Sequence, residues 1–210
     1  MLSFLSMILS SSTVLRTDTE RWTSKTYPDP RLNFSQCHTW PGSALCDPDY
    51  ILTDQWRLDI NNNINLQNSL LEQVDHFDNK NALERCRQND TKPPHIYVIL
   101  AKRIQTQMNQ TIATSEDALV NLGNEIVKEL DLKSEFRSNF IIVLGVADAK
   151  KVFIQTGQDL ELPDDFLSST FRKYDNLFNV RNHMEGLNDV ITEMARKIID
   201  HLNVSVVLNI

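Results

Sequence analysis

The stretch NFIIVLGVADAKKVFIQTG, residues 139–157, decides the fold. Its first part, Asn139–Asp148, is an almost unbroken apolar run, which is typical of a β-strand covered on both faces. The residues AKK then turn the chain, and VFIQTG (152–157) returns as a second strand. The stretch therefore predicts a central buried strand with an antiparallel hairpin partner.

A second strand and the helices follow on either side of this stretch. The β-branched and aromatic segment HIYVILAK, His95–Lys102, follows two prolines and predicts a strand. Between the strands, TSED (Thr114–Asp117) fits a capping box that opens a helix. Apolar residues at helical spacing predict further helices over Thr53 to about Asp75, over Asp164 to about Phe171, and from about Leu187 to Leu202. Because a strand–helix–strand unit gives parallel neighbours, we expect an α/β fold with a mixed, mostly parallel sheet sandwiched between helices.

Length and charge limit the classes of partner. The chain has 210 residues, 41% of them hydrophobic, which suits one globular domain. Its formal net charge is −7, and the sequence shows no basic stripe with interleaved aromatic residues. An acidic chain of this kind repels phosphate backbones and anionic membrane surfaces, so we expect no nucleic-acid partner.

The N-terminal residues indicate export from the cytosol. An apolar run followed by small residues predicts a signal peptide over 1–15. An irregular, proline-containing lead-in is expected over 16–45. Sequons for N-glycosylation occur at four asparagines: Asn33, Asn89, Asn109 and Asn203. No apolar stretch reaches the roughly 18 residues that a membrane-spanning helix needs. We therefore expect a secreted or extracellular glycoprotein without a span in this chain.

The three cysteines match no zinc-site spacing. In an oxidising compartment two of them are expected to pair. Cys37 with Cys46 would close a small loop around HTWPGSAL, and this is the preferred pairing. Cys46 with Cys86 would instead tether the start of the first helix to a later loop.

Motifs for catalysis are missing from the sequence. It contains no nucleotide-binding glycine loop, no nucleophile elbow and no paired-histidine zinc motif. Oxygen-rich loops can hold calcium, which leaves Asp47, Asp49 and Asp148 as metal candidates. The alternative is structural, because "DPD" is a turn sequence, and Asp49 or Thr53 can cap the helix that follows. The structural interpretation is preferred, so no catalytic residue and no cofactor is expected.

Three segments carry a resemblance to a known family. CDPDYILTDQWRLDINNNI (46–64), NFIIVLGVADAKKVFIQTGQDLE (139–161) and the closing part from Leu162 to Ile198 resemble, in order, three segments of the TPM domain. With the lead-in TYPDP, they are most similar to its nematode branch, the modulator of the levamisole receptor. The resemblance implies a TPM domain over 46–203 with a short tail at 204–210. Tyr50 departs from the family pattern, which has glycine there.

The resemblance implies that the protein binds a partner rather than catalyses a reaction. The nematode modulator is an extracellular TPM domain that associates with a levamisole-sensitive acetylcholine receptor and raises its response. The implied partner is thus the ectodomain of a membrane receptor or channel. Some plant and bacterial TPM relatives have phosphatase activity or bind a divalent metal, so a metal-dependent phosphatase is the alternative, with Asp47 and Asp148 as the first residues to test.

Overall fold

The computed structural model describes residues 22–73, 93–104, 116–132, 139–157, 160, 162, 165–167, 169–170, 173 and 182–207. Its elements are β1 (Leu45–Cys46), α1 (Asp54–Glu72), β2 (His95–Ala101), α2 (Glu116–Glu129), β3 (Phe140–Val146), β4 (Lys151–Thr156) and α5 (His183–Val207).

The four strands form one sheet in the order β1-β2-β3-β4. β1 pairs with β2 and β2 with β3 in parallel, and β3 pairs with β4 in an antiparallel hairpin. Every residue of β3 is buried, as the apolar run predicts. The mixed, mostly parallel sheet expected from the sequence is confirmed. The two-residue strand β1 was not predicted.

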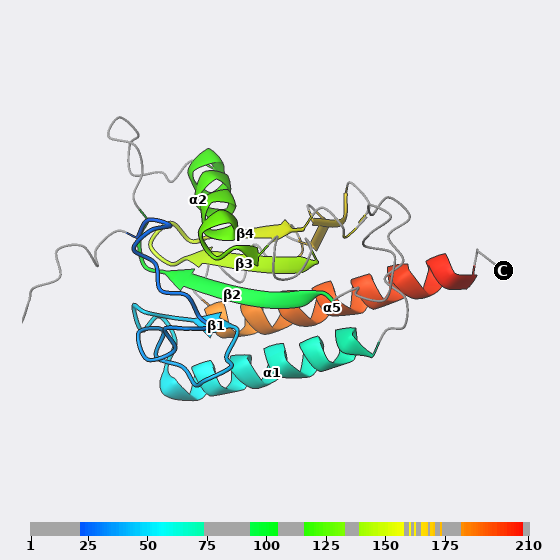
Figure 1. The fold of residues 1–210 in the computed structure, drawn as a ribbon, viewed down its shortest axis with the longest axis horizontal. Helices are drawn as coiled ribbons and strands as arrows, with labels where there is room; N and C mark the ends of the chain where they lie inside the picture. Colours follow the sequence, from blue (N-terminus) through cyan, green and yellow to red (C-terminus); the bar gives the residue numbers. More distant parts are fainter. Residues whose placement is uncertain are drawn as a thin grey trace, which may run out of the picture.

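Helices cover both faces of the sheet. α1 and α5 lie side by side across one face, and α2 lies on the opposite face (Figure 1). Asn63 on α1 donates to the side-chain oxygen of Asn188 on α5 at 3.0 Å. Gly123 lets α2 approach β4 closely, because a Cβ at this position would lie 2.9 Å from the ring of Phe153. The α/β/α sandwich is thus the arrangement that the sequence predicts.

Thr53 begins α1 as predicted. Its side chain accepts a hydrogen bond from the backbone N–H of Trp56 at 3.2 Å and satisfies a donor that the helix leaves unpaired. The inward face of α1 carries polar as well as apolar side chains. Asn68 accepts from the N–H of Ile96 on β2 at 2.9 Å, and Ser43 donates to Asn61 at 2.7 Å. Since these amides are buried and bonded, they fix how α1 sits on the sheet.

The lead-in packs as part of the domain from Trp22 onward. Trp22 forms a parallel bridge with Ile104, and its ring meets that of Tyr27 edge-on, with 5.4 Å between centroids. The buried hydroxyl of Tyr27 lies 2.8 Å from the carbonyl oxygen of Leu100 and 3.0 Å from that of Cys46. Burial raises the pKa of Tyr27 well above its usual value. The segment therefore closes the sheet beyond the ends of β1 and β2.

Some predicted features fall outside the described residues. Residues 1–15, the predicted signal peptide, lie there, as do Thr114 and Ser115 of the predicted capping box. The short helix predicted over Asp164–Phe171 is only partly described, and its described residues 166–167 and 169–170 are helical.

Candidate functional site

The segment Cys46–Asp49 leaves the carboxyl end of β1 and is tied down at its first residue. Cys46 forms a disulfide with Cys37, with 4.4 Å between the Cα atoms, and both residues are fully buried. The bond joins β1 to the irregular lead-in. Of the two pairings considered from the sequence, the structure contains the preferred one. Cys86 lies outside the described residues.

Asp47 is fully buried behind this disulfide. Its two carboxylate oxygens accept the backbone N–H groups of Ile51 at 2.8 Å and Leu52 at 2.9 Å. Its Oδ2 atom also lies 3.3 Å from a guanidinium nitrogen of Arg57. Burial raises the pKa of Asp47, and the two N–H groups and Arg57 offset part of that rise. The carboxylate thus holds the turn that leads into α1.

Asp49 joins three separate parts of the chain. Its Oδ2 atom accepts the indole N–H of Trp22 at 2.7 Å and the backbone N–H of Lys102 at 2.6 Å. The sequence left Asp49 and Thr53 as alternative caps for α1. Thr53 is the cap, and Asp49 instead binds the lead-in and the residue that follows β2.

Asp148 lies in the turn between β3 and β4. Its carboxylate accepts from the guanidinium of Arg103, which follows β2, at 2.5 Å, and both side chains are about half exposed. The backbone N–H of Asp148 also donates to the carbonyl of Lys102 at 3.1 Å. Asp49 therefore binds Lys102, and Asp148 binds both Lys102 and Arg103, at the end of β2.

The three carboxylates gather at the carboxyl ends of the parallel strands, which is where open α/β sheets commonly bind ligands. Each of them accepts at least one hydrogen bond from a protein donor. Within the described residues, no group of three or more His, Cys, Asp or Glu side chains is placed to share a metal ion. In the structure, the three carboxylates form hydrogen bonds that join the residues following β1, β2 and β3.

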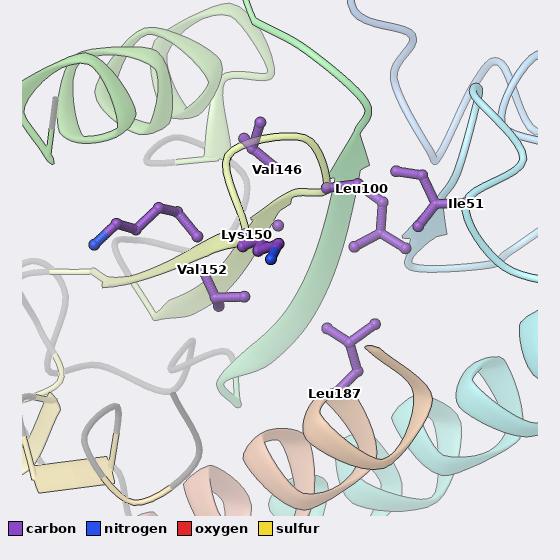
Figure 2. A pocket seen from close by; sticks show the side chains of 9 residues that line it. Ile51, Leu100, Val146, Lys150, Val152 and Leu187 are labelled. Atoms are coloured by element: carbon purple, nitrogen blue, oxygen red, sulfur yellow. The ribbon is translucent and has the colours of Figure 1, made fainter. Parts of the chain in front are cut away.

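A shallow apolar depression opens at the same edge (Figure 2). Its wall is formed by Leu100 from β2, Val146 from β3, Val152 from β4, Ile51 from the turn before α1 and Leu187 from α5. Gly145, Ala147, Lys150 and Lys151 complete its lining. Sequence reasoning did not find this feature. The sequence signal for its basic border was present in Lys102 and Arg103, at the end of one predicted strand, and in Lys150 and Lys151, which follow the next.

Tyr50 keeps the backbone conformation that favours glycine, with φ +54°. Its ring stacks on His38 with 3.7 Å between centroids, and the guanidinium of Arg57 lies 4.9 Å from its centroid. These contacts offset the steric cost of a Cβ in the left-handed region. The turn is therefore retained although the family's glycine is replaced.

The predicted glycosylation sites differ in their setting. Asn33 is exposed, in a turn of the lead-in where its carbonyl accepts from the N–H of Cys37 at 3.0 Å. Asn203 lies within α5. Asn89 and Asn109 lie outside the described residues. Glycosylation stays a prediction for each of them.

The helices that the structure describes include none that is both long enough and apolar enough to span a bilayer.

The protein is a small disulfide-bonded α/β domain whose sheet is covered by helices on both faces. The chain belongs to the family described as modulator of levamisole receptor-1, whose profile matches residues 22–150. The resemblance to the nematode branch of the TPM domain is thereby confirmed. No curated protein sequence matches the chain.

Two solved structures share the fold. One is the BA42 protein of the psychrophilic bacterium Bizionia argentinensis, at 15% identity and a TM-score of 0.52, covering 73% of this chain and 86% of that one. The other is the N-terminal domain of a protein from P. gingivalis, at 15% identity and a TM-score of 0.51, covering 86% of this chain and 93% of that one. At this identity the likeness concerns the fold alone.

Proposed function

We propose that this protein is an extracellular interaction module that associates with a levamisole-type acetylcholine receptor channel and modulates its response. The observation that carries the proposal is the family match over residues 22–150. That family is named for modulation of the levamisole receptor, and the match includes the disulfide, the sheet edge and α1.

The disulfide supports the extracellular part of the proposal. Cys37 and Cys46 are fully buried and bonded, and they fasten the lead-in to the first strand. Disulfides that hold a fold together persist in oxidising compartments and are rare in the cytosol. The intact mass of protein secreted from cultured cells tests this, because it reports leader cleavage, glycans and the oxidised cysteines together. Retention in the cell as a fully reduced, unglycosylated chain would contradict it.

The receptor part is tested by co-expression. Cells that express a levamisole-sensitive receptor are recorded with and without this chain, and we expect a larger levamisole-evoked current in its presence. Co-precipitation from the same cells asks whether the effect involves association. An unrelated secreted domain of similar size is the control. An unchanged current together with no co-precipitation would overturn the proposal.

A metal-dependent phosphatase is the second candidate. It is favoured by the position of Asp49 and Asp148 at the carboxyl ends of parallel strands, around the basic residues Lys102 and Arg103. Purified protein is assayed on a phosphate monoester with calcium, magnesium and manganese in turn. Metal-dependent turnover that is lost in Asp148→Ala would support this candidate. Equal turnover in that variant would argue for a contaminant.

A further inference from the structure

Four exposed basic side chains lie at the carboxyl edge of the sheet, beside the three carboxylates described above. Lys102 and Arg103 follow β2, and Lys150 and Lys151 close the hairpin between β3 and β4, and all four side chains are exposed. Arg103 pairs with Asp148. Among the described residues, the ammonium groups of Lys102, Lys150 and Lys151 form no ion pair. We call these four residues the basic rim.

The basic rim borders the apolar depression formed by Ile51, Leu100, Val146, Val152 and Leu187 (Figure 2). The depression is about the size of a single water molecule. A Cβ at Gly145 would lie 2.9 Å from a methyl carbon of Leu100, so the floor is closed by that side chain. The space is too small for a whole organic ligand, but it can receive the tip of one apolar side chain.

The hairpin presents its lysines in a fixed geometry. Lys150 adopts a left-handed backbone conformation with φ +51°, and its N–H donates to the carbonyl of Ala147 at 3.1 Å. The N–H of Ala147 in turn donates to the carbonyl of Ala101 at 2.9 Å, which fastens the turn to the end of β2. Because the backbone of the turn is already ordered, only the lysine side chains lose conformational entropy when a partner binds.

We propose that the basic rim and the depression are the docking face for an acidic segment of a partner protein, one that presents an apolar side chain flanked by carboxylates. The apolar side chain enters the depression, and the carboxylates meet Lys150, Lys151 and Lys102. This proposal rests on the proposed function, because that function supplies the protein partner, the receptor ectodomain. It adds the face that is used and the chemistry that it recognises.

A peptide segment fits this face better than an anionic membrane does. A membrane surface would meet the whole chain, whose net charge is −7, whereas a narrow segment meets only the rim. The depression also fits one protruding apolar group, which a protein side chain supplies.

The first test measures binding of a synthetic peptide that carries one leucine between pairs of glutamates, followed by NMR of the isotope-labelled full chain. We expect shifts concentrated in residues 100–103 and 146–152, and binding that weakens as salt is added. The charge-reversal variant Lys150→Glu/Lys151→Glu should bind about tenfold more weakly or worse. The matched control is Lys128→Glu on α2, which should bind as the wild type does.

A second variant separates the depression from the charge. Ala147→Phe adds a ring at a residue that lines the depression and keeps all four cations, so it should weaken binding of the leucine peptide but not of a peptide with serine in place of leucine. A folded NMR spectrum of each variant shows that the domain is intact. Binding unaffected by the charge reversal, or equal binding of a lysine-rich peptide, would overturn the proposal. Binding to anionic vesicles without binding to the peptide would overturn it as well.

The receptor recording tells this proposal apart from the proposed function. A current that rises with wild-type chain but not with Lys150→Glu/Lys151→Glu supports the docking face. An equal rise with both chains overturns the docking face and leaves the proposed function standing. If wild-type chain has no effect, the proposed function fails, and the peptide titration still decides what the rim binds.

Discussion

The carboxylate of Asp47 lies 3.3 Å from the guanidinium of Arg57, and their side chains are 0% and 4% exposed. The pair joins the turn after β1 to the first turn of α1. Arg57 also donates to the carbonyl oxygen of Leu52 at 2.9 Å and to Asp54. Every group in this buried network therefore has a partner, which is the condition for a buried ion pair to be tolerated.

Removing one partner of this pair should be costly. Asp47→Ala leaves the N–H groups of Ile51 and Leu52 without their acceptor and removes the buried counter-charge of Arg57, whose remaining partners are the carbonyl of Leu52 and the exposed Asp54. We expect a loss of about 3–5 kcal/mol in the free energy of unfolding, measured by urea denaturation. The control is Asp54→Ala, which removes the exposed partner of Arg57 and should cost far less. Equal losses in the two variants would show that Asp47 is not the anchor of the network.

The disulfide should raise the free energy of unfolding by an amount that depends on the length of the loop that it closes. The bond links residues that are 9 apart in sequence. In the chain-entropy view a loop of this size is worth about 2–3 kcal/mol. Cys37→Ala/Cys46→Ala, made together with Cys86→Ser to prevent exchange, should lower the unfolding free energy by that amount relative to Cys86→Ser alone.

Reduction supplies the control for this prediction. A reductant should bring the Cys86→Ser protein down to the stability of the triple variant and leave the triple variant unchanged. A protein whose stability does not respond to reductant would contradict the pairing of Cys37 with Cys46.

His95 should make the fold sensitive to acid. Burial lowers the pKa of His95 to about 4. The amide of Asn68 is oriented by the N–H of Ile96, so its nitrogen faces Nε2 of His95 at 3.2 Å, and that ring nitrogen accepts. Protonation removes this acceptor and charges a partly buried ring.

The sign of the pH effect follows from that shift. The pKa of histidine is near 6.5 in the unfolded chain, so below it the unfolded state binds the proton first, and stability falls as pH drops from about 6.5 to 4. The loss is complete below the folded-state pKa and amounts to about 3 kcal/mol. Urea unfolding of the wild type and of His95→Gln across this range measures it. The slope attributed to His95 should be absent in the variant, and an identical slope in both proteins would assign the acid sensitivity elsewhere.

At Tyr50, substitution by glycine should leave the protein more stable than substitution by alanine. Tyr50→Ala keeps a Cβ in the left-handed region and loses the ring contacts with His38 and Arg57. Tyr50→Gly loses the same contacts but removes the backbone cost of about 1 kcal/mol. Thermal unfolding should therefore rank Tyr50→Gly above Tyr50→Ala. The reverse order would mean that the turn relaxes once the ring is gone.

The hydrophobic pattern determined most of the secondary structure. The run from Phe140 to Val146 predicted a strand covered on both sides, and the strand from His95 to Ala101 lies within a residue of its predicted end. Thr53 caps α1 because its hydroxyl is placed to accept from Trp56, a local relation that a sequence can reveal. The family could likewise be identified from short local segments, since their residues shape turns and strand ends.

The candidate site depended on contacts between residues far apart in the chain. β1 has only two residues, so no periodicity could reveal it, and it exists because β2 pairs with it. Asp49 resembles a helix cap in the sequence, yet it binds Trp22 and Lys102, which lie 27 and 53 residues away. The basic rim arises in the same way, because parallel pairing of β2 and β3 brings the residues after β2 and the β3–β4 turn to one edge of the sheet.

The sequence by itself therefore determined most of the helices and strands, the covered sheet and the family, because local periodicity and capping chemistry act over a few residues. Only the tertiary structure decided what the acids do and where the lysines gather. Hydrogen bonds and charges act through space, and β-pairing sets which distant residues share an edge of the sheet.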